Sequence, residues 1–386
     1  MQSEINVGIL GHVDHGKTTL VEALTGKWTD THSEEMKRGI SIKLGYATFE
    51  SHYCEACNAW SVKPKCPKCK KKLEPKRRIS LLDSPGHEAL MTTAISGSAL
   101  MDGVLFLISA NEKCPQPQTI EHMLILKVMG IRNVVVVQTK LDLVSKERAY
   151  ESYREIKNFL SENGVDAPIV PVAAIHKINI DKLVEAIESN IKTPKRDINA
   201  PPKMFIVRSF DVNKPGTPPE KLVGGVIGGS LARGVLRKGD IVKSSGHIVK
   251  RFRITSLAEE NERLEEATPG GLIAVGTELD PAITKKDKMV GIVIGRDGEI
   301  EDPVDLLKVK VHMLDRKDFE NKGLTPSEQV VVSVNTATTI GFVDKIKKHS
   351  AEIRLKYPVW VEKGNKVAIS RKIGHMWRLS AYAVVE

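Results

Sequence analysis

The sequence has no apolar run long enough to cross a membrane. Its longest runs, VLFLIS (104–109) and VVVV (134–137), are far shorter than the ~18 residues of a membrane-spanning helix. The N-terminal MQSEINVGIL enters an apolar strand pattern without the charged, apolar and small-residue regions of a signal peptide. We therefore expect a soluble, cytoplasmic protein with no membrane partner.

Cysteine is also scarce, with five residues in a chain of 386. Four of the five form two Cys-x-x-Cys pairs in the segment CEACNAWSVKPKCPKC (54–69). Such pairs are typical of a metal site in a reducing compartment rather than of a disulfide scaffold. We expect Cys54, Cys57, Cys66 and Cys69 to hold one tetrahedral, structural Zn²⁺, with no open position for catalysis. The alternative is a loop that holds no metal. Cys114 is expected to be a packed thiol.

Acidic side chains are nearly absent from one basic stretch. Residues 63–78 contain nine lysines and arginines and one glutamate, which supplies +8 of the chain's net charge of +10. The rest of the chain is close to neutral. This local charge indicates a polyanionic partner, and a charged loop that contacts only solvent is the alternative.

The length and an apolar content of 41% predict a globular protein of two or three domains. Up to about residue 190, strand patterns alternate with helical ones, as in a doubly wound, mostly parallel sheet. The strand patterns are Ile5–Leu10, Ile79–Leu82, Val104–Ser109, Val134–Gln138 and Ile169–Val172.

Long helical periodicity is absent after the Pro-rich segment TPKRDINAPP (193–202). Short strand patterns separated by Gly and Pro follow, and they are typical of β-barrels. We therefore predict an α/β P-loop domain at 1–199, with the cysteine-containing insertion at 52–72. Two all-β barrel domains are predicted at 200–297 and 298–386.

A phosphate-binding motif follows the first strand pattern. GHVDHGKT (11–18) fits GxxxxGK[ST] and precedes a helical pattern, which is the context that this motif requires. The turn's N–H groups can bind phosphates, Lys17 can contact the β- and γ-phosphates, and the Thr18 hydroxyl can bind Mg²⁺. We assign phosphate binding to Val13, Asp14, His15, Gly16, Lys17, Thr18, Thr19 and Gly86.

LLDSPGH (81–87) provides a second element of a nucleotide site. Asp83 follows an apolar strand pattern, and its carboxylate can hold Mg²⁺. Gly86 can present its N–H to the γ-phosphate and can pivot when that phosphate leaves. His87 can orient the attacking water, and we assign it as catalytic. A histidine with a purely structural role is the alternative.

The segment DTHSEEMKRGISIKLG (30–45) is a candidate sensor of the γ-phosphate. Such a segment needs a hydroxyl for Mg²⁺ and a free backbone amide. Ser41 offers the hydroxyl, with Gly39 and Ile40 beside it. A charged helix-capping segment is the alternative.

VVVVQTKLD (134–142) predicts the choice of base. The Asp142 carboxylate can accept hydrogen bonds from guanine N1 and N2, which adenine cannot donate, so we expect GTP and GDP rather than adenine nucleotides. Lys140 can lie along the base, and Ala174 in PVAAIH (171–176) can offer its N–H to guanine O6. The expected guanine-binding residues are Thr139, Lys140, Asp142, Ala173, Ala174 and Ile175.

At these motifs the sequence resembles the translational GTPases. Four longer stretches resemble the gamma subunits of archaeal and eukaryotic translation initiation factor two. They are TDTHSEEMKRGISIKLGYA, DSPGHEALMTTAISGSALMDG, PPKMFIVRSFDVNKPGTPPEKLVGGVIGGSL and ISRKIGHMWRLSAYAVV. The match covers all three predicted domains, and the four-cysteine insertion also belongs to that family.

The resemblance implies a GTP hydrolase that carries initiator methionyl-tRNA to the small ribosomal subunit. It implies a heterotrimer whose alpha subunit binds the first barrel domain and whose beta subunit binds the GTP-binding domain. It also implies Mg²⁺ on Thr18, Ser41 and Asp83. Asp14 is expected to be a second catalytic residue and, with Gly39, to bind a second cation.

Three residues depart from the family pattern. Thr139 stands where the family has Asn, Ala173 where Ser is usual, and Ser41 where Thr is usual. Because Asp142 is retained, we expect the preference for guanine to survive. The alternative functions are an elongation-factor-like carrier of another aminoacyl-tRNA and the GTPase subunit of a sulfate adenylyltransferase. The initiation-type stretches argue against both.

Overall fold

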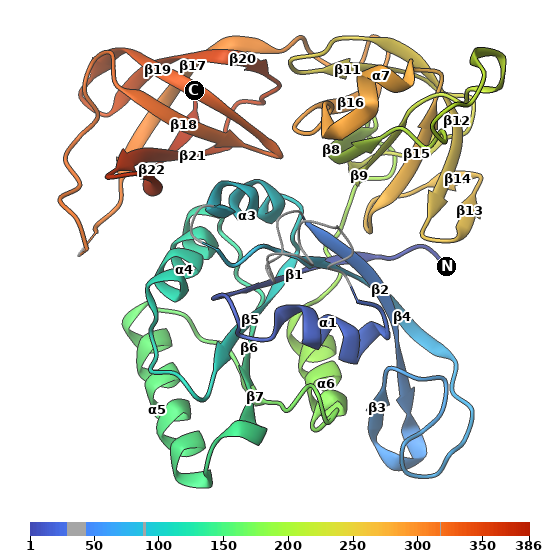
Figure 1. The fold of residues 1–386 in the computed structure, drawn as a ribbon, viewed down its shortest axis with the longest axis vertical. Helices are drawn as coiled ribbons and strands as arrows, with labels where there is room; N and C mark the ends of the chain where they lie inside the picture. Colours follow the sequence, from blue (N-terminus) through green and yellow to red (C-terminus); the bar gives the residue numbers. More distant parts are fainter. Residues whose placement is uncertain (29–43, 88–89, 317) are drawn as a thin grey trace. The chain divides into compact units, whose positions relative to one another are not determined.

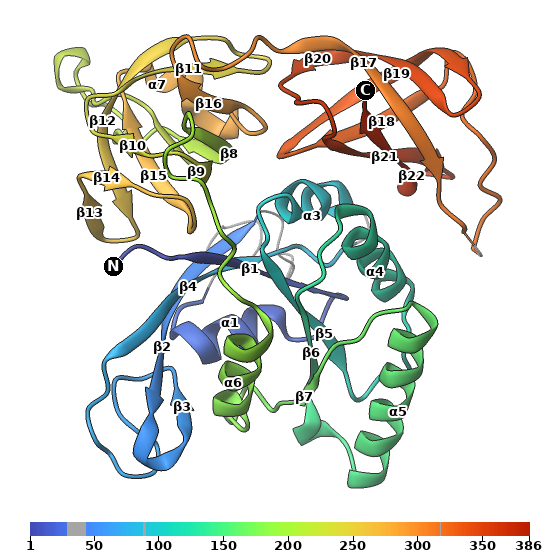
Figure 2. The same cartoon turned by 180° about the vertical axis from the view of Figure 1, so that it is seen from behind.

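The computed structural model describes residues 1–28, 44–87, 90–316 and 318–386. The chain divides into two compact units. Met1 with Ser3–Pro194 forms the first, and Gln2 with Lys195–Glu386 forms the second. Figures 1 and 2 show both units from opposite sides, and each is described by itself.

The first unit is built on a seven-stranded sheet of order β3-β2-β4-β1-β5-β6-β7. The strands β4, β1, β5, β6 and β7 are parallel, whereas β2 runs antiparallel to both β4 and β3. The strands are β1 (Ile5–Gly11), β2 (Gly45–Cys54), β3 (Ala59–Ser61), β4 (Pro75–Asp83), β5 (Gly103–Ser109), β6 (Val134–Thr139) and β7 (Ile169–Pro171).

Helices cover both faces of this sheet (Figures 1 and 2). One face carries α1 and α6, and the other carries α3, α4 and α5. The helices are α1 (Lys17–Thr25), α3 (Met91–Ser98), α4 (Pro117–Met129), α5 (Lys146–Glu162) and α6 (Ile180–Asn190), with short 3-10 turns at Glu55–Cys57 and Leu141–Leu143. Because the sheet is covered on both sides, strands such as β1 and β5 are buried along their whole length.

The predicted α/β architecture is confirmed, and each of the five strand patterns coincides with a strand. The strand β4 begins at Pro75, four residues before the predicted start at Ile79. The prediction began late because Arg77 and Arg78 interrupt the apolar pattern, although both are buried in the structure. The strands β2 and β3 were not predicted. In β2, polar residues alternate irregularly with apolar ones, and buried positions with half-buried ones, so the sequence shows no clear strand pattern.

The second unit contains two antiparallel barrels, as predicted. In the first, β11-β16-β8-β9-β15-β12 pair in order, and a further pairing of β11 with β12 closes the ring. The second closes in the order β17-β20-β19-β18-β21-β22. The predicted boundaries at 199 and 297 stay predictions.

The first barrel region contains β8 (Lys203–Phe210), β9 (Val226–Arg233), β10 (Leu236–Arg237), β11 (Ile241–Ser245), β12 (Arg251–Glu259), β13 (Glu262–Leu264), β14 (Glu266–Ala267), β15 (Ile273–Thr277) and β16 (Val293–Arg296). Its short helical segments are Pro219–Lys221, α7 (Pro281–Thr284) and Lys285–Asp287. The second barrel contains β17 (Val304–Met313), β18 (Gln329–Val334), β19 (Ala337–Lys347), β20 (Ser350–Val359), β21 (Lys366–Ile373) and β22 (Met376–Val385). Among the described residues, no helix is both long and apolar enough to span a membrane.

Candidate nucleotide-binding site and cysteine cluster

The sequence-predicted nucleotide residues that the structure describes lie at one edge of the first sheet. The parallel strands β1, β4, β5, β6 and β7 end there, and the segments that follow them carry the motifs. Ligands of doubly wound sheets bind at this carboxyl edge. The topology therefore brings together residues that are far apart in the sequence.

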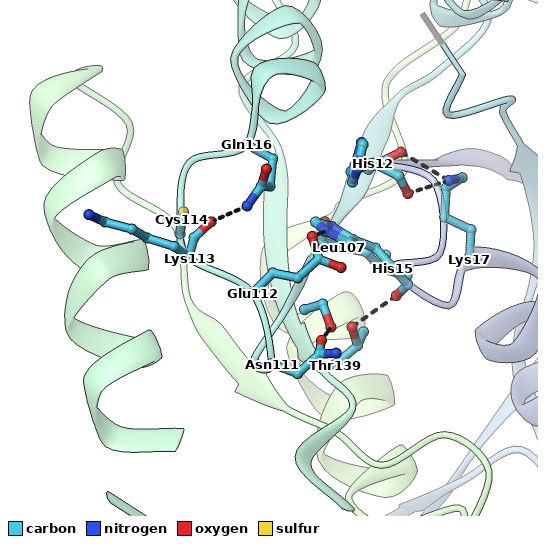
Figure 3. A network of polar contacts seen from close by, with 12 residues as sticks. His12, His15, Lys17, Leu107, Asn111, Glu112, Lys113, Cys114, Gln116 and Thr139 are labelled. Atoms are coloured by element: carbon cyan, nitrogen blue, oxygen red, sulfur yellow. Dashed lines mark hydrogen bonds and ion pairs between the residues drawn. The ribbon is translucent and has the colours of Figure 1, made fainter. Parts of the chain in front are cut away.

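The phosphate-binding loop joins β1 to α1. Gly16 has φ 80° and Asp14 has φ 62°, left-handed values that Gly adopts without strain. Lys17 donates hydrogen bonds of 2.9 Å and 2.8 Å to the carbonyl oxygens of Gly11 and His12, as Figure 3 shows. These bonds hold the ammonium group against the loop that the motif assigns to the phosphates.

Two of the three expected magnesium ligands meet in the structure. The Thr18 hydroxyl donates a 3.0 Å hydrogen bond to Oδ2 of Asp83, whose side chain is buried. Hydroxyl and carboxylate oxygens are ligands that suit Mg²⁺, so the donor set fits that ion. The third expected ligand, Ser41, lies outside the described residues, as do Gly39 and Ile40.

Gly86 is in close contact with the phosphate-binding loop. A Cβ atom at Gly86 would lie 2.4 Å from Lys17 Nζ and 2.7 Å from the carbonyl oxygen of Gly11. Any larger residue would displace Lys17 or the loop. The next residue, His87, is half-buried and lies close enough to His12 for their charges to interact. Asp14 is exposed on the loop.

His15 has a structural environment that its motif position did not predict. Its Nδ1 lies 3.0 Å from the carbonyl oxygen of Leu107, and its Nε2 lies 3.4 Å from Oε2 of Glu112 (Figure 3). Burial lowers the pKa of His15, although the Leu107 carbonyl and Glu112 oppose that shift. A neutral imidazole with its proton on Nδ1 donates to the Leu107 carbonyl, and only a second proton on Nε2 would make a hydrogen bond to Glu112.

His122 on α4 is a second histidine that the sequence reasoning missed. Its side chain is fully buried, and burial lowers its pKa to about 3. The positive charges of Lys17, His15 and His12 contribute to this lowered value. No motif contains His122, and only the burial of its helix face could have indicated it.

The expected guanine-binding residues do not all play the same part. Thr139 is buried, and its hydroxyl donates a 2.8 Å hydrogen bond to the carbonyl oxygen of His15 (Figure 3). Thr139 thus connects the end of β6 to the phosphate-binding loop. Lys140 follows with φ 58°, and this turn leads into the segment that carries Asp142.

The loop after β7 approaches Asp142. His176 Nε2 lies 3.9 Å from Oδ2 of Asp142, a contact that the sequence did not predict. Ala173 is buried and forms an isolated antiparallel bridge with Ile178. Between them, Ala174 is half-buried and Ile175 is 71% exposed. The structure therefore places this tight loop beside the predicted base-recognising carboxylate.

The four paired cysteines also come together. One sulfur from each of Cys54, Cys57, Cys66 and Cys69 lies within 4.8 Å of the other three. The Cys54 and Cys69 sulfurs are 3.7 Å apart, far beyond disulfide length. With Zn–S bonds of about 2.3 Å, tetrahedral geometry separates its sulfurs by about 3.8 Å, so the cluster fits Zn²⁺.

The thiols of this cluster interact with one another and with backbone N–H groups. Cys69 donates its N–H to the Cys66 sulfur at 3.5 Å. Burial opposes ionisation of Cys66, but N–H groups of Cys69 and Lys68 bring its pKa down to about 6. The pKa of Cys57 is raised to about 12, chiefly by its hydrogen bond with the Cys69 sulfur. A thiolate is the form that binds a metal.

Two family models match the chain. The model described as the elongation factor Tu GTP binding domain matches residues 2–193. The model described as the C-terminal part of initiation factor eIF2 gamma matches residues 299–385. The first unit is therefore a GTP-binding domain of the type found in translational GTPases.

Curated relatives match along the whole chain. The translation initiation factor 2 subunit gamma of Pyrococcus horikoshii is 49% identical over 402 aligned residues, which cover 100% of this chain and 98% of the relative. The subunit of the same name from Methanothermobacter thermautotrophicus is 48% identical and covers 100% of this chain and 99% of the relative.

Solved structures show the same fold. A bacterial selenocysteine-specific elongation factor has a TM-score of 0.79 and 28% identity; the match covers 100% of this chain but 58% of that protein. Translation elongation factor SelB of Methanococcus maripaludis has a TM-score of 0.76 at 24% identity, with 100% and 79% covered. The sequence identity of these two structures to the chain is lower than that of the initiation-factor relatives. Because those relatives are nearly half identical along the whole chain, the chain belongs to the gamma subunits of translation initiation factor 2.

Proposed function

We propose that this chain carries initiator methionyl-tRNA to the small ribosomal subunit and hydrolyses GTP on release. The observation that supports this most strongly is the full-length similarity to gamma subunits. The contact of Thr18 with Asp83 and the position of Lys17 against the loop support the assignment of these three residues to phosphate and Mg²⁺.

In this proposal, the residues of the site exchange their present contacts for contacts with nucleotide. Lys17 leaves the carbonyls of Gly11 and His12 for the β- and γ-phosphates. Bound Mg²⁺ neutralises phosphate charge, and Thr18, Asp83 and Ser41 would hold it. His87 orients the attacking water, and Asp14 has a supporting catalytic role. Asp14 and Gly39 would also bind a second cation.

The base would be recognised beside β6 and β7. Asp142 accepts the hydrogen bonds of guanine N1 and N2, Lys140 lies along the ring, and the loop of Ala173, Ala174 and Ile175 covers O6. Thr139 acts by fixing the phosphate-binding loop rather than by reading the base, which its bond to His15 supports.

The partners are proposed from the family. An alpha subunit would bind the first barrel domain, a beta subunit the GTP-binding domain, and Zn²⁺ would be held by the four cysteines. An elongation-type carrier is the second candidate, because the solved structures of similar fold carry that title. The initiation-type family model over residues 299–385 favours the first.

Filter binding distinguishes these candidates. We would compare initiator methionyl-tRNA with an elongator aminoacyl-tRNA, each with GTP and with GDP, and with and without an alpha subunit. We expect binding of the initiator tRNA in the GTP state and weak binding of the elongator tRNA. Equal affinity for both tRNAs would favour the elongation-type function.

A further inference from the structure

The cysteine-containing loop is packed against the GTP-binding domain rather than extending freely from it. The strand β3 pairs with β2, so that Trp60 lies opposite Tyr53. Trp60 and Val62 pack against the main core of this domain. Within the loop, Ala59 and Leu73 form a small buried cluster with Cys54 and Cys66. The side chains on its outside are therefore presented from a fixed position.

The outside of this loop is covered by lysines. Seven lysines and one glutamate lie between residues 63 and 76, and all eight side chains are exposed. We call this surface the lysine patch; it consists of Lys63, Lys65, Lys68, Lys70, Lys71, Lys72 and Lys76. The two arginines that follow are not part of it.

Arg77 and Arg78 are buried instead. Arg77 contacts Glu188 at 3.2 Å and donates a 3.0 Å hydrogen bond to the carbonyl oxygen of Ile191. Arg78 donates to the carbonyl oxygen of Met1 at 2.8 Å. These two residues have structural roles, so the binding charge indicated by the sequence resides in the lysines alone.

Like charges are crowded within the lysine patch. Lys65 and Lys72 form an isolated antiparallel bridge, which places them directly opposite each other. Like charges in such a pair destabilise it. A bound polyanion would relieve this repulsion, whereas a patch exposed only to solvent gains nothing from the arrangement.

The lysine patch has no apolar anchor. Residues 44–87 are described without a gap, and none of the chain's large exposed hydrophobic side chains lies among them. Tyr53 and Trp60 pack on each other, with ring centroids 4.8 Å apart. Protein interfaces are enriched in aromatic anchors and depleted of lysine, and single-stranded nucleic acids stack on exposed aromatics.

We propose that the lysine patch binds the phosphate backbone of double-helical RNA, without reading its sequence. Lysines without aromatic neighbours suit phosphate contacts, which need charge and little shape. That this RNA belongs to an initiation complex rests on the proposed function, whereas phosphate binding by the lysines does not.

The test uses the full chain, purified with its metal, and a short RNA hairpin of unrelated sequence. Fluorescence anisotropy measures its dissociation constant over a range of KCl concentrations. The patch variant combines Lys71→Gln, Lys72→Gln and Lys76→Gln. The control variant combines Lys308→Gln, Lys310→Gln and Lys347→Gln, three exposed lysines on strands of the second barrel, so both variants lose the same net charge.

We expect the patch variant to bind the hairpin about 10- to 100-fold more weakly near 0.1 M salt, with a salt slope smaller by about 2 to 3. The control should change less than about twofold, and both should keep the parent's GDP affinity. Equal loss in the two variants, or no loss in the patch variant, overturns the proposal. Tighter patch-dependent binding of polyglutamate than of the hairpin overturns it in favour of an acidic protein. If the chain does not distinguish initiator from elongator tRNA in filter binding, the proposed function is contradicted. The hairpin measurement would still test phosphate binding by the lysine patch.

Discussion

The hydroxyl of Thr139 donates a 2.8 Å hydrogen bond to the carbonyl oxygen of His15. This buried contact joins the end of β6 to the phosphate-binding loop, across 124 positions of sequence. The resemblance to the family implies Asn at position 139, where this chain has Thr. In the structure, its hydroxyl fixes the loop on which the phosphates are expected to lie.

We predict that Thr139→Val weakens GDP and GTP binding about tenfold. Valine has nearly the same shape but leaves the His15 carbonyl without its donor, which costs about 1–3 kcal/mol when the group is buried. Titration with a fluorescent guanine nucleotide measures the effect. Thr139→Ser keeps the hydroxyl and should bind almost as well as the parent; equal weakening in Ser and Val variants would contradict this role.

The motifs could be recognised in the sequence, but the contacts among their residues could not be predicted from it. GHVDHGKT and DSPGH are local patterns, so Lys17, Thr18 and Asp83 could be placed from spacing alone. The contact of His176 with Asp142 and the contacts of His15 with Leu107 and Glu112 depend on which strands are neighbours, and spacing does not report that order. The strand β2 was missed because polar residues are mixed with the apolar ones on both of its faces. The structure shows that the seven patch lysines are exposed and that the two arginines after them are buried. The charge of the sequence could not distinguish these two groups.

Asp142→Asn should change which purine nucleotide is preferred. The carboxylate accepts two hydrogen bonds from guanine, and an amide can accept only one while offering a donor. We therefore expect weaker GTP binding and measurable binding of xanthosine triphosphate, which carries an oxygen where guanine has its amino group. Competition titrations with both nucleotides measure the change. A variant that still rejects xanthosine triphosphate and prefers GTP would show that another residue reads the base.

His87→Ala should slow GTP hydrolysis by about 100-fold or more while GTP affinity stays unchanged, because a positioned water-orienting group contributes on this scale. Single-turnover hydrolysis and nucleotide titration measure the two quantities separately. His375→Ala, in the exposed turn between β21 and β22, is the matched control and should leave both unchanged. Unchanged hydrolysis in the His87 variant would remove it from catalysis.

Acid should destabilise the GTP-binding domain through its buried histidines. Burial lowers the pKa of His122 from 6.5 to about 3, and it also lowers the pKa of His15 and His12. The unfolded chain therefore binds more protons below pH 6.5, so this contribution to stability is complete above that pH and is lost as the pH falls. For His122 alone the loss is about 2 kcal/mol at pH 5.

The His122→Leu variant isolates this contribution. Its unfolding free energy should fall less than the parent's between pH 7.5 and pH 5, by about 2 kcal/mol. His375→Leu, at an exposed position, should follow the parent. Chemical unfolding followed by circular dichroism at both pH values gives the comparison. Parallel pH profiles for the parent and the His122 variant would rule out titration of that histidine.

Removal of zinc should open the cysteine-containing loop without unfolding the rest of the domain. The loop's own buried cluster is small, so four Zn–S bonds would supply most of its local stability. We expect about one zinc per chain by elemental analysis after native purification. Chelation or Cys66→Ser should unfold the loop locally, so that trypsin cleaves at the lysine patch, while GDP affinity is kept. Cys114→Ser, which changes a buried thiol outside the cluster, should retain both zinc and trypsin resistance. Sub-stoichiometric zinc in natively purified protein, with the loop already resistant to trypsin, would mean that the packing of Trp60 and Val62 holds the loop without a metal.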